Sequence, residues 1–176
     1  MKYNKKRINM EIKNSQNKKE NNIQNENRQK QFDKFKLSPE EIEKILKADK
    51  PYLAASRNDF ESLKILIENG KDVNQQDIFG YTALMMASIK NNLEIAKYLV
   101  EHKADLNIIN CWGDSAIVLA AEFNSIDVGK YLLEKGADPT IKNFFGFDAL
   151  RHTIENRNFE FFELIKKYLE NYEKNK

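Results

Sequence analysis

The chain has 176 residues and a formal net charge of +2, and 41% of its residues are hydrophobic and 32% charged. This composition is ordinary for a soluble protein. No apolar run approaches the roughly 20 residues of a membrane span, and no apolar core follows the basic N-terminus as in a secretory signal. We therefore expect a cytoplasmic protein with no membrane span, although a protein exported without a signal would have the same features.

Residues 1–36 differ in composition from the rest of the chain. They are rich in asparagine and lysine, and their eleven basic and four acidic residues give a net charge of +7, against −5 for the remainder. Because so few apolar residues cannot offset the chain entropy, we predict a disordered basic tail. Such a tail could bind nucleic acid through charge, dock weakly on the acidic remainder, or be a solvated extension, and we favour the last.

A short helix is predicted at residues 38–47. Ser38 is a helix-capping residue, Pro39 suits the first helical position, and Glu41 completes a capping box. This helix would shield the core that follows it, as the terminal units of a repeat array must. Its apolar face comprises Ile42, Ile45 and Leu46.

From residue 48 the sequence repeats with a period of 33 residues, most visibly at Gly80, Gly113 and Gly146. A residue with a capping side chain stands at one register position in each copy, and a first helix should begin just after it. Alanines at inward positions, such as Ala87 and Ala120, would let neighbouring helices approach closely. The four capping residues are Asp49, Thr82, Ser115 and Asp148.

A second helix follows a short turn in each copy, because apolar residues recur there at helical spacing. The predicted buried stripes are Leu93, Ala96, Leu99 and Val100; Phe60, Leu63, Leu66 and Ile67; Ile126, Gly129, Leu132 and Leu133; and Phe159, Phe162, Ile165 and Lys166. The lysine that ends the last stripe indicates that nothing stacks beyond it. A Gly129→Ala change should stabilise the protein by up to about 1 kcal/mol if a methyl group fits.

The repeats resemble the ankyrin repeat, whose period is about 33 residues and whose signature is T-P-L-H-x-A. Residues 82–87 read TALMMA, and the family's G-A-D-x-N turn corresponds to KGADPT at 135–140 and NGKDVN at 69–74. Lys103 replaces the turn glycine in one copy, where a left-handed backbone would strain a side chain. The signature histidine is replaced in every copy, by Met85, Val118 or Arg151.

The resemblance covers about residues 45–169. It implies an all-α, ankyrin-like helical solenoid of about four helix-turn-helix repeats joined by β-hairpin loops, with an N-terminal capping helix. We place the domain at residues 37–172. Its repeats span about residues 48–76, 77–109, 110–142 and 143–172.

Catalytic patterns are nearly absent from the sequence. His102 and His152 are the only histidines and Cys111 the only cysteine, and they lack the spacing of a zinc site. No phosphate-binding loop or serine nucleophile elbow is present. We therefore predict no enzyme, no metal and no cofactor, and an enzyme that uses Cys111 as its nucleophile is the least favoured alternative.

In ankyrin proteins the loop tips and the exposed side of the first helices line a concave groove that binds partners. Six of the twelve tip positions here are aromatic, which is typical of interface anchors. The opposing interpretation is that these rings pack sideways on one another and only stiffen the array. The predicted partner-binding residues are Ile78, Phe79, Tyr81, Ile89, Lys90, Cys111, Trp112, Asp114, Glu122, Phe123, Phe144, Phe145 and Phe147.

The sequence thus predicts a monomeric scaffold that binds an unidentified partner protein through this groove. The alternative is a nucleic-acid-associated adaptor whose basic tail binds polyanions while the repeats bind protein.

Overall fold

The computed structural model describes residues 38–174. The chain divides into two units between Lys44 and Ile45, and helix α2 (Pro39–Ala48) begins in the first and ends in the second. At its start Glu41 N–H donates to Ser38 Oγ (3.2 Å) and Ser38 N–H donates to the Glu41 carboxylate (2.7 Å). The predicted capping box is therefore present. The predicted disorder of residues 1–36 lies outside the described residues.

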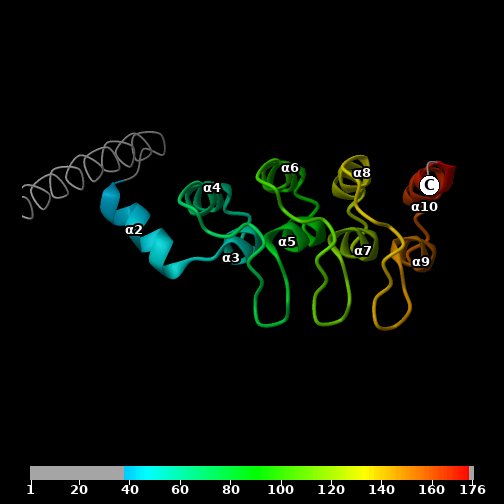
Figure 1. The fold of residues 1–176 in the computed structure, drawn as a ribbon, viewed down its shortest axis with the longest axis horizontal. Helices are drawn as coiled ribbons and strands as arrows, with labels where there is room; N and C mark the ends of the chain where they lie inside the picture. The colour runs from blue at the N-terminus through cyan, green and yellow to red at the C-terminus, as the bar shows by residue number, and fades with distance from the viewer. Residues whose placement is uncertain (1–37, 175–176) are drawn as a thin grey trace, which may run out of the picture. The chain divides into compact units, whose positions relative to one another are not determined.

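The second unit is built from helix pairs. The first helices form one row and the second helices form another, and the loops after α4, α6 and α8 project away from the second row (Figure 1). Residues 38–174 contain no strand, so the fold is all-helical, as the sequence predicts. The pairs are α3 (Pro51–Ser56) with α4 (Phe60–Glu68), α5 (Ala83–Ile89) with α6 (Leu93–Glu101), α7 (Ala116–Glu122) with α8 (Ile126–Glu134), and α9 (Ala149–Glu155) with α10 (Phe159–Lys174).

The core lies between the two rows. Ala87 and Ala120 are fully buried, and these small side chains allow α5 and α7 to pack side by side. The predicted stripes of the inner second helices are also correct at their central positions, because Ala96, Leu99 and Leu132 are fully buried. None of the helices described in residues 38–174 combines the length and apolar character needed to cross a membrane.

In α10 the predicted stripe is partly wrong. Phe161 and Ile165 are the buried residues, whereas Phe159 is 78% exposed. The reason is the end of the array. The ring of Phe60, at the same register position in α4, packs edge-on against Tyr98 of the following pair, with ring centroids 5.4 Å apart. Phe159 belongs to the last described pair and has no following helix to cover it.

The stabilisation predicted for Gly129→Ala also needs correction. A methyl group at this position would lie 2.0 Å from Cζ of Phe161 and under 3 Å from both Cε atoms of the ring. Phe161 is itself fully buried, so the ring fills the space that the predicted stabilising methyl group would need. The glycine in α8 thus accommodates a large aromatic residue from α10.

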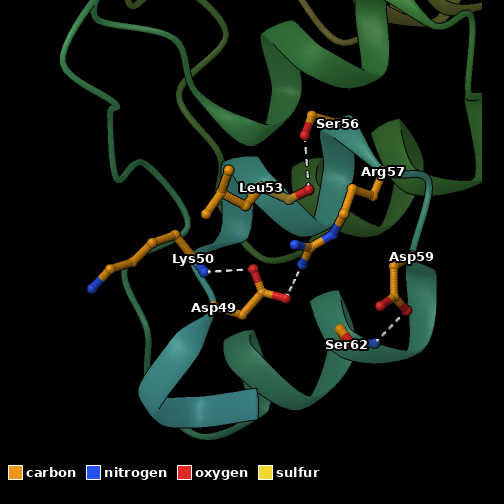
Figure 2. A network of polar contacts seen from close by, with 7 residues as sticks. All are labelled: Asp49, Lys50, Leu53, Ser56, Arg57, Asp59 and Ser62. Atoms are coloured by element: carbon orange, nitrogen blue, oxygen red, sulfur yellow. Dashed lines mark hydrogen bonds and ion pairs between the residues drawn. The ribbon is translucent and has the colours of Figure 1, made fainter. Parts of the chain in front are cut away.

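The predicted helix cap at Asp49 is also wrong. Lys50 precedes Pro51, and a residue before proline is disfavoured in helical conformation. Lys50 is accordingly extended (φ −132°, ψ 149°) and is itself the N-cap. The Asp49 carboxylate instead accepts from the Lys50 N–H (2.9 Å) and forms an ion pair with Arg57, so it ties the two ends of α3 together (Figure 2).

The other predicted caps have mixed outcomes. Thr82 Oγ1 accepts from Met85 N–H (3.2 Å), and an Asp148 carboxylate oxygen accepts from Arg151 N–H (2.9 Å). Ser115 stands at the N-cap of α7, but its buried hydroxyl makes no hydrogen bond within residues 38–174. Two of the four predicted caps are therefore formed as expected.

The turns between paired helices contain residues in the left-handed region. Asn58, Asn91 and Asn124 have φ of +61°, +50° and +61°, and Arg157, 33 residues further, has +55°. Asparagine tolerates this conformation better than arginine does. Lys103, which replaces a turn glycine, has φ +69°, so the predicted left-handed backbone is confirmed there.

Asparagine side chains in these turns also connect successive pairs. The Asn92 amide donates to Asn58 Oδ1, and the Asn158 amide donates to Asn124 Oδ1. Asn91 connects the second pair to the third. Its Oδ1 accepts from Val128 N–H (3.2 Å) and its amide donates to Asp127 (3.0 Å). The repeats are therefore joined by polar contacts as well as by the core.

Candidate functional site

Three loop tips, here called fingers, comprise residues 77–81, 110–114 and 143–147. The first residue of each finger holds the loop closed with its side chain. Asp77 Oδ1 accepts from the N–H groups of Phe79 (2.9 Å) and Tyr81 (2.8 Å). Asn110 and Asn143 Oδ1 each accept the two corresponding bonds at 2.9–3.1 Å. The sequence signal for this closure is an Asp or Asn three residues before each glycine, which sequence reasoning missed.

Glycine is required inside the fingers for two reasons. Gly80 and Gly113 have φ of +84° and +85°, which a side chain disfavours. A methyl group on Gly80 would also lie 2.9 Å from Cα of Asn110, and one on Gly113 would lie 3.0 Å from the backbone nitrogen of Phe144. Adjacent fingers therefore pack against each other at their glycines.

Single backbone hydrogen bonds link adjacent fingers. Cys111 N–H donates to the carbonyl of Phe79 (2.8 Å), and Phe144 N–H donates to the carbonyl of Trp112 (2.9 Å). Each finger is closed by its side-chain cradle and a few backbone bonds, and no β-ladder forms in residues 38–174. The β-hairpin description expected from the resemblance is thus corrected, because the fingers are turns without strands.

The predicted aromatic row is continuous across the first two fingers. The rings of Phe79 and Trp112 stack with centroids 5.9 Å apart and an angle of 29°, and Tyr81 lies 5.7 Å from Trp112. The third finger is more open, because Phe144 and Phe145 are 73% and 71% exposed. The row therefore combines a packed aromatic cluster with an exposed end.

The remaining predicted site residues differ in exposure. Asp114 is only 7% exposed, and its carboxylate accepts from the Asn143 amide (2.8 Å), so it joins two fingers and offers a partner little surface. Tyr81, Ile89 and Phe147 are half-buried. The exposed members are Ile78, Lys90, Cys111, Glu122 and Phe123.

The ends of the first helices bring further residues to this side. The Asn156 amide donates to the carbonyls of Ala121 (3.0 Å) and Glu122 (2.7 Å), so the end of α9 is fixed against the end of α7. The Arg151 guanidinium lies over the Phe147 ring, 4.7 Å from its centroid, and His152 contacts the same ring edge-on (5.5 Å). Neither Arg151 nor His152 was predicted, because the repeat register marks them only as helix positions.

Carboxylates dominate the electrostatics around Tyr81. Partial burial raises the pKa of the Tyr81 phenol, and the nearby Asp114 and Glu122 carboxylates raise it further. Partial burial also raises the pKa of the Glu122 carboxyl, with His152 opposing this increase and Asp114 adding to it. The charges of the Asp114 and Glu122 carboxylates therefore both act on the Tyr81 phenol.

Residues 38–174 hold no cluster of three or more His, Cys, Asp and Glu side chains that could bind a metal ion. Cys111 is exposed on the second finger. His102 Nδ1 is hydrogen-bonded to the Tyr98 carbonyl (2.8 Å), and its ring lies tilted against that of Tyr98, with centroids 4.1 Å apart. These contacts give His102 a structural role.

Paired helices stacked in two rows, with turn-closed fingers at a period of 33 residues, define a helical repeat protein. A family model described as ankyrin repeats, in three copies, matches residues 52–143, just over half of the chain. The chain belongs to the ankyrin repeat family. A search of curated proteins finds no match. The pair α9–α10 lies entirely beyond the matched range, so the four-repeat division and its boundaries remain predictions.

Ankyrin repeats generally mediate protein–protein interactions and are typically non-enzymatic modules.

Proposed function

We propose that this protein binds a partner protein through a surface formed by the three fingers and the exposed ends of the first helices, here called the finger face. The observation that carries the proposal is the exposure of Phe144 and Phe145, together with Ile78, which is 90% exposed. Exposed apolar residues gathered on one face mark interaction sites, and aromatic anchors are common hot spots.

The packed rings support the same proposal. Phe79 and Trp112 are stacked on each other and keep part of their surface exposed. A pre-ordered pair loses little side-chain entropy when a partner covers it. We therefore assign Phe79 and Trp112 both a stiffening and a binding role, and Phe145 a binding role. Asp114 contributes through the shape of the fingers.

A pull-down with the purified full-length chain, followed by mass spectrometry, would identify partners. The test uses a triple variant, Phe79→Ala, Trp112→Ala and Phe145→Ala, measured for both capture and thermal unfolding. We expect the variant to keep its helical signal and lose specific capture. Undiminished capture by a stable triple variant would contradict the proposal and point to the outer helix faces.

The alternative prediction, nucleic-acid contact through the basic segment 1–36, concerns residues outside those described. Retention on a DNA or RNA column that weakens with salt, and that deletion of residues 1–36 abolishes, would favour it.

A further inference from the structure

The backbone contacts between adjacent fingers follow one pattern. The Phe79 carbonyl accepts from the Cys111 N–H of the second finger (2.8 Å). The Trp112 carbonyl accepts in the same way from the Phe144 N–H of the third finger (2.9 Å). Phe145 is the corresponding residue of the third finger, and its carbonyl accepts no hydrogen bond from the described part of the chain. The third finger therefore ends the row with an unused backbone acceptor.

The glycines show that the same edge of the third finger is uncovered. A methyl group on Gly80 would lie 2.9 Å from Cα of Asn110, and one on Gly113 would lie 3.0 Å from the backbone nitrogen of Phe144. A methyl group on Gly146 would meet no atom within 4 Å. Gly146 nevertheless has φ +80°, close to the +84° and +85° of the other two glycines. The third finger thus has the backbone of the first two without the neighbour that covers them.

Exposed rings lie beside this edge. Phe144 and Phe145 are 73% and 71% exposed, whereas Phe79 and Trp112, which stack on each other, are 49% and 39% exposed. An exposed backbone edge can bind a partner segment through main-chain hydrogen bonds, while neighbouring side chains give specificity. The edge of the third finger offers both kinds of contact.

The helix row does not continue at this end. Ser88 and Ala121 are small, fully buried residues at one register position of α5 and α7, and the Asn156 amide of α9 donates to the Ala121 carbonyl (3.0 Å). Ile154 stands at this position in α9 and is 56% exposed. Its larger side chain occupies space that a further first helix would need, so the edge favours a segment that continues the fingers alone.

A second copy of the chain does not fit the edge. The first finger leads into α5, and α5 packs against α3. If the first finger of a second copy followed the third finger of the first copy, its α5 would lie beside α9. The α3 helix of that copy would then coincide with α9. The occupant is therefore a segment of a different protein.

We propose that the open edge of the third finger binds a turn of the partner protein that continues the finger row. A backbone N–H of the turn donates to the Phe145 carbonyl, its Cα atom lies against Gly146, and its apolar side chains cover Phe144 and Phe145. The turn is closed by an Asn or Asp side chain followed by an apolar residue, as the second and third fingers are closed by Asn110 and Asn143. The inference rests on the proposed function and names the chemistry of the partner segment.

The probe for the test is a copy of the third finger. A fluorescent peptide with the sequence of residues 141–149, cyclised head to tail to hold the turn, is titrated with the full-length protein, and fluorescence anisotropy reports binding. This sequence carries the Phe144 N–H that bonds to the second finger. We expect saturable binding with a dissociation constant below about 1 mM. No binding at that concentration would overturn the inference.

Gly146→Ala tests the close approach from the protein side. The added methyl group should meet the bound turn as closely as the 2.9 and 3.0 Å found at Gly80 and Gly113, and weaken binding about tenfold or more. Gly136→Ala is the matched control, because Gly136 has φ +91° and also has no atom within 4 Å of an added methyl group. Both variants should lose similar thermal stability, and Gly136→Ala should bind like the wild type. Wild-type affinity in Gly146→Ala would overturn the inference.

A change in the probe tests the hydrogen bond without altering the protein. Replacing the peptide's amide at Phe144 by an ester removes the N–H donor and should weaken binding about three- to tenfold. The same replacement at Lys142, whose N–H donates no hydrogen bond in the described part of the chain, should change little. Equal effects of the two esters would show that side chains alone bind, and would overturn the inference.

Capture of a partner separates this inference from the proposed function. We expect both Gly146→Ala and the triple alanine variant to lose capture. Lost capture by the triple variant, with undiminished capture by Gly146→Ala, would overturn the inference and leave the proposed function intact. Undiminished capture by a stable triple variant would overturn both.

Discussion

Gly129→Ala should destabilise the protein, although helix propensity alone predicts the opposite. The added methyl group would lie 2.0 Å from Cζ and 2.8 and 2.9 Å from the two Cε atoms of Phe161. Overpacking of a filled core commonly costs about 1–3 kcal/mol, and a contact this short in a fully buried ring belongs at the upper end. The gain from replacing glycine by alanine in a helix is about 1 kcal/mol. We expect a net loss of about 1–2 kcal/mol in the free energy of unfolding.

The assay is denaturant unfolding followed by circular dichroism, within a double-mutant cycle. Phe161→Leu removes the three ring atoms that the methyl group would meet, so Gly129→Ala should cost at least about 1 kcal/mol less in that background. Ala96→Gly, at the same register position one repeat earlier, is the control and should lose about 1 kcal/mol or more. Stabilisation of the wild type by Gly129→Ala, or an unchanged effect of this substitution in the Phe161→Leu background, would refute the packing argument.

Three further outcomes follow from the backbone and the titrating groups. Lys103→Gly and Arg157→Asn should each stabilise the protein by up to about 1–2 kcal/mol in the same unfolding assay, because both residues have positive φ; unchanged midpoints would contradict this. Glu122→Gln should raise the melting temperature at pH 7 but not below pH 4. The pKa of the Glu122 carboxyl is raised in the folded state, so its ionisation destabilises the fold as the pH rises through that pKa. A lower melting temperature at pH 7 would argue against this. Burial raises the pKa of Tyr98 to about 12, so the folded state holds the phenol proton more tightly than the unfolded state does. The free energy of unfolding should therefore fall as the pH rises from about 10 to 12. Tyr98→Phe should reduce this dependence on pH in alkaline melts.

The repeat architecture could be predicted from the sequence because equivalent residues recur at a constant spacing. Gly80, Gly113 and Gly146 keep a constant period, and all three have the positive φ that explains the choice of glycine. The family and the two-row helical fold follow from such positions. Lys103 was correctly predicted as strained for the same reason, since its register partners are glycines.

Predictions based on the repeat register are wrong where the array ends or where a neighbouring residue changes the local backbone. Phe159 occupies a stripe position but lies on the last described pair, so no described helix covers it, and Phe161 is buried instead. Asp49 occupies a capping position, but Pro51 moves the helix start by one residue. Gly129 was misread because the ring that fills its space comes from a different helix, and periodicity does not show which side chains meet.

The candidate site was predictable as a set of positions and not as a set of contacts. Sequence register places Asp114 and Glu122 on the same side, yet only the structure shows that Asp114 is buried between fingers. The difference arises because Asn143 lies 29 residues away and its amide reaches Asp114 only when the fingers stack. Likewise, only the structure shows that Glu155 is paired with Arg151.

The most direct test of the finger face compares two exposed phenylalanines. Phe145 lies on the third finger and is 71% exposed, and Phe159 begins the outer helix α10 and is 78% exposed. Each is changed to alanine in the full-length chain, and the dissociation constant for a captured partner is measured together with the melting temperature. Because both side chains are exposed, both variants should melt close to the wild type. Phe145→Ala should weaken binding about thirtyfold, as loss of a hot spot does, and Phe159→Ala should leave it unchanged. Wild-type affinity in Phe145→Ala, or an equal loss in both variants, would contradict binding through the finger face.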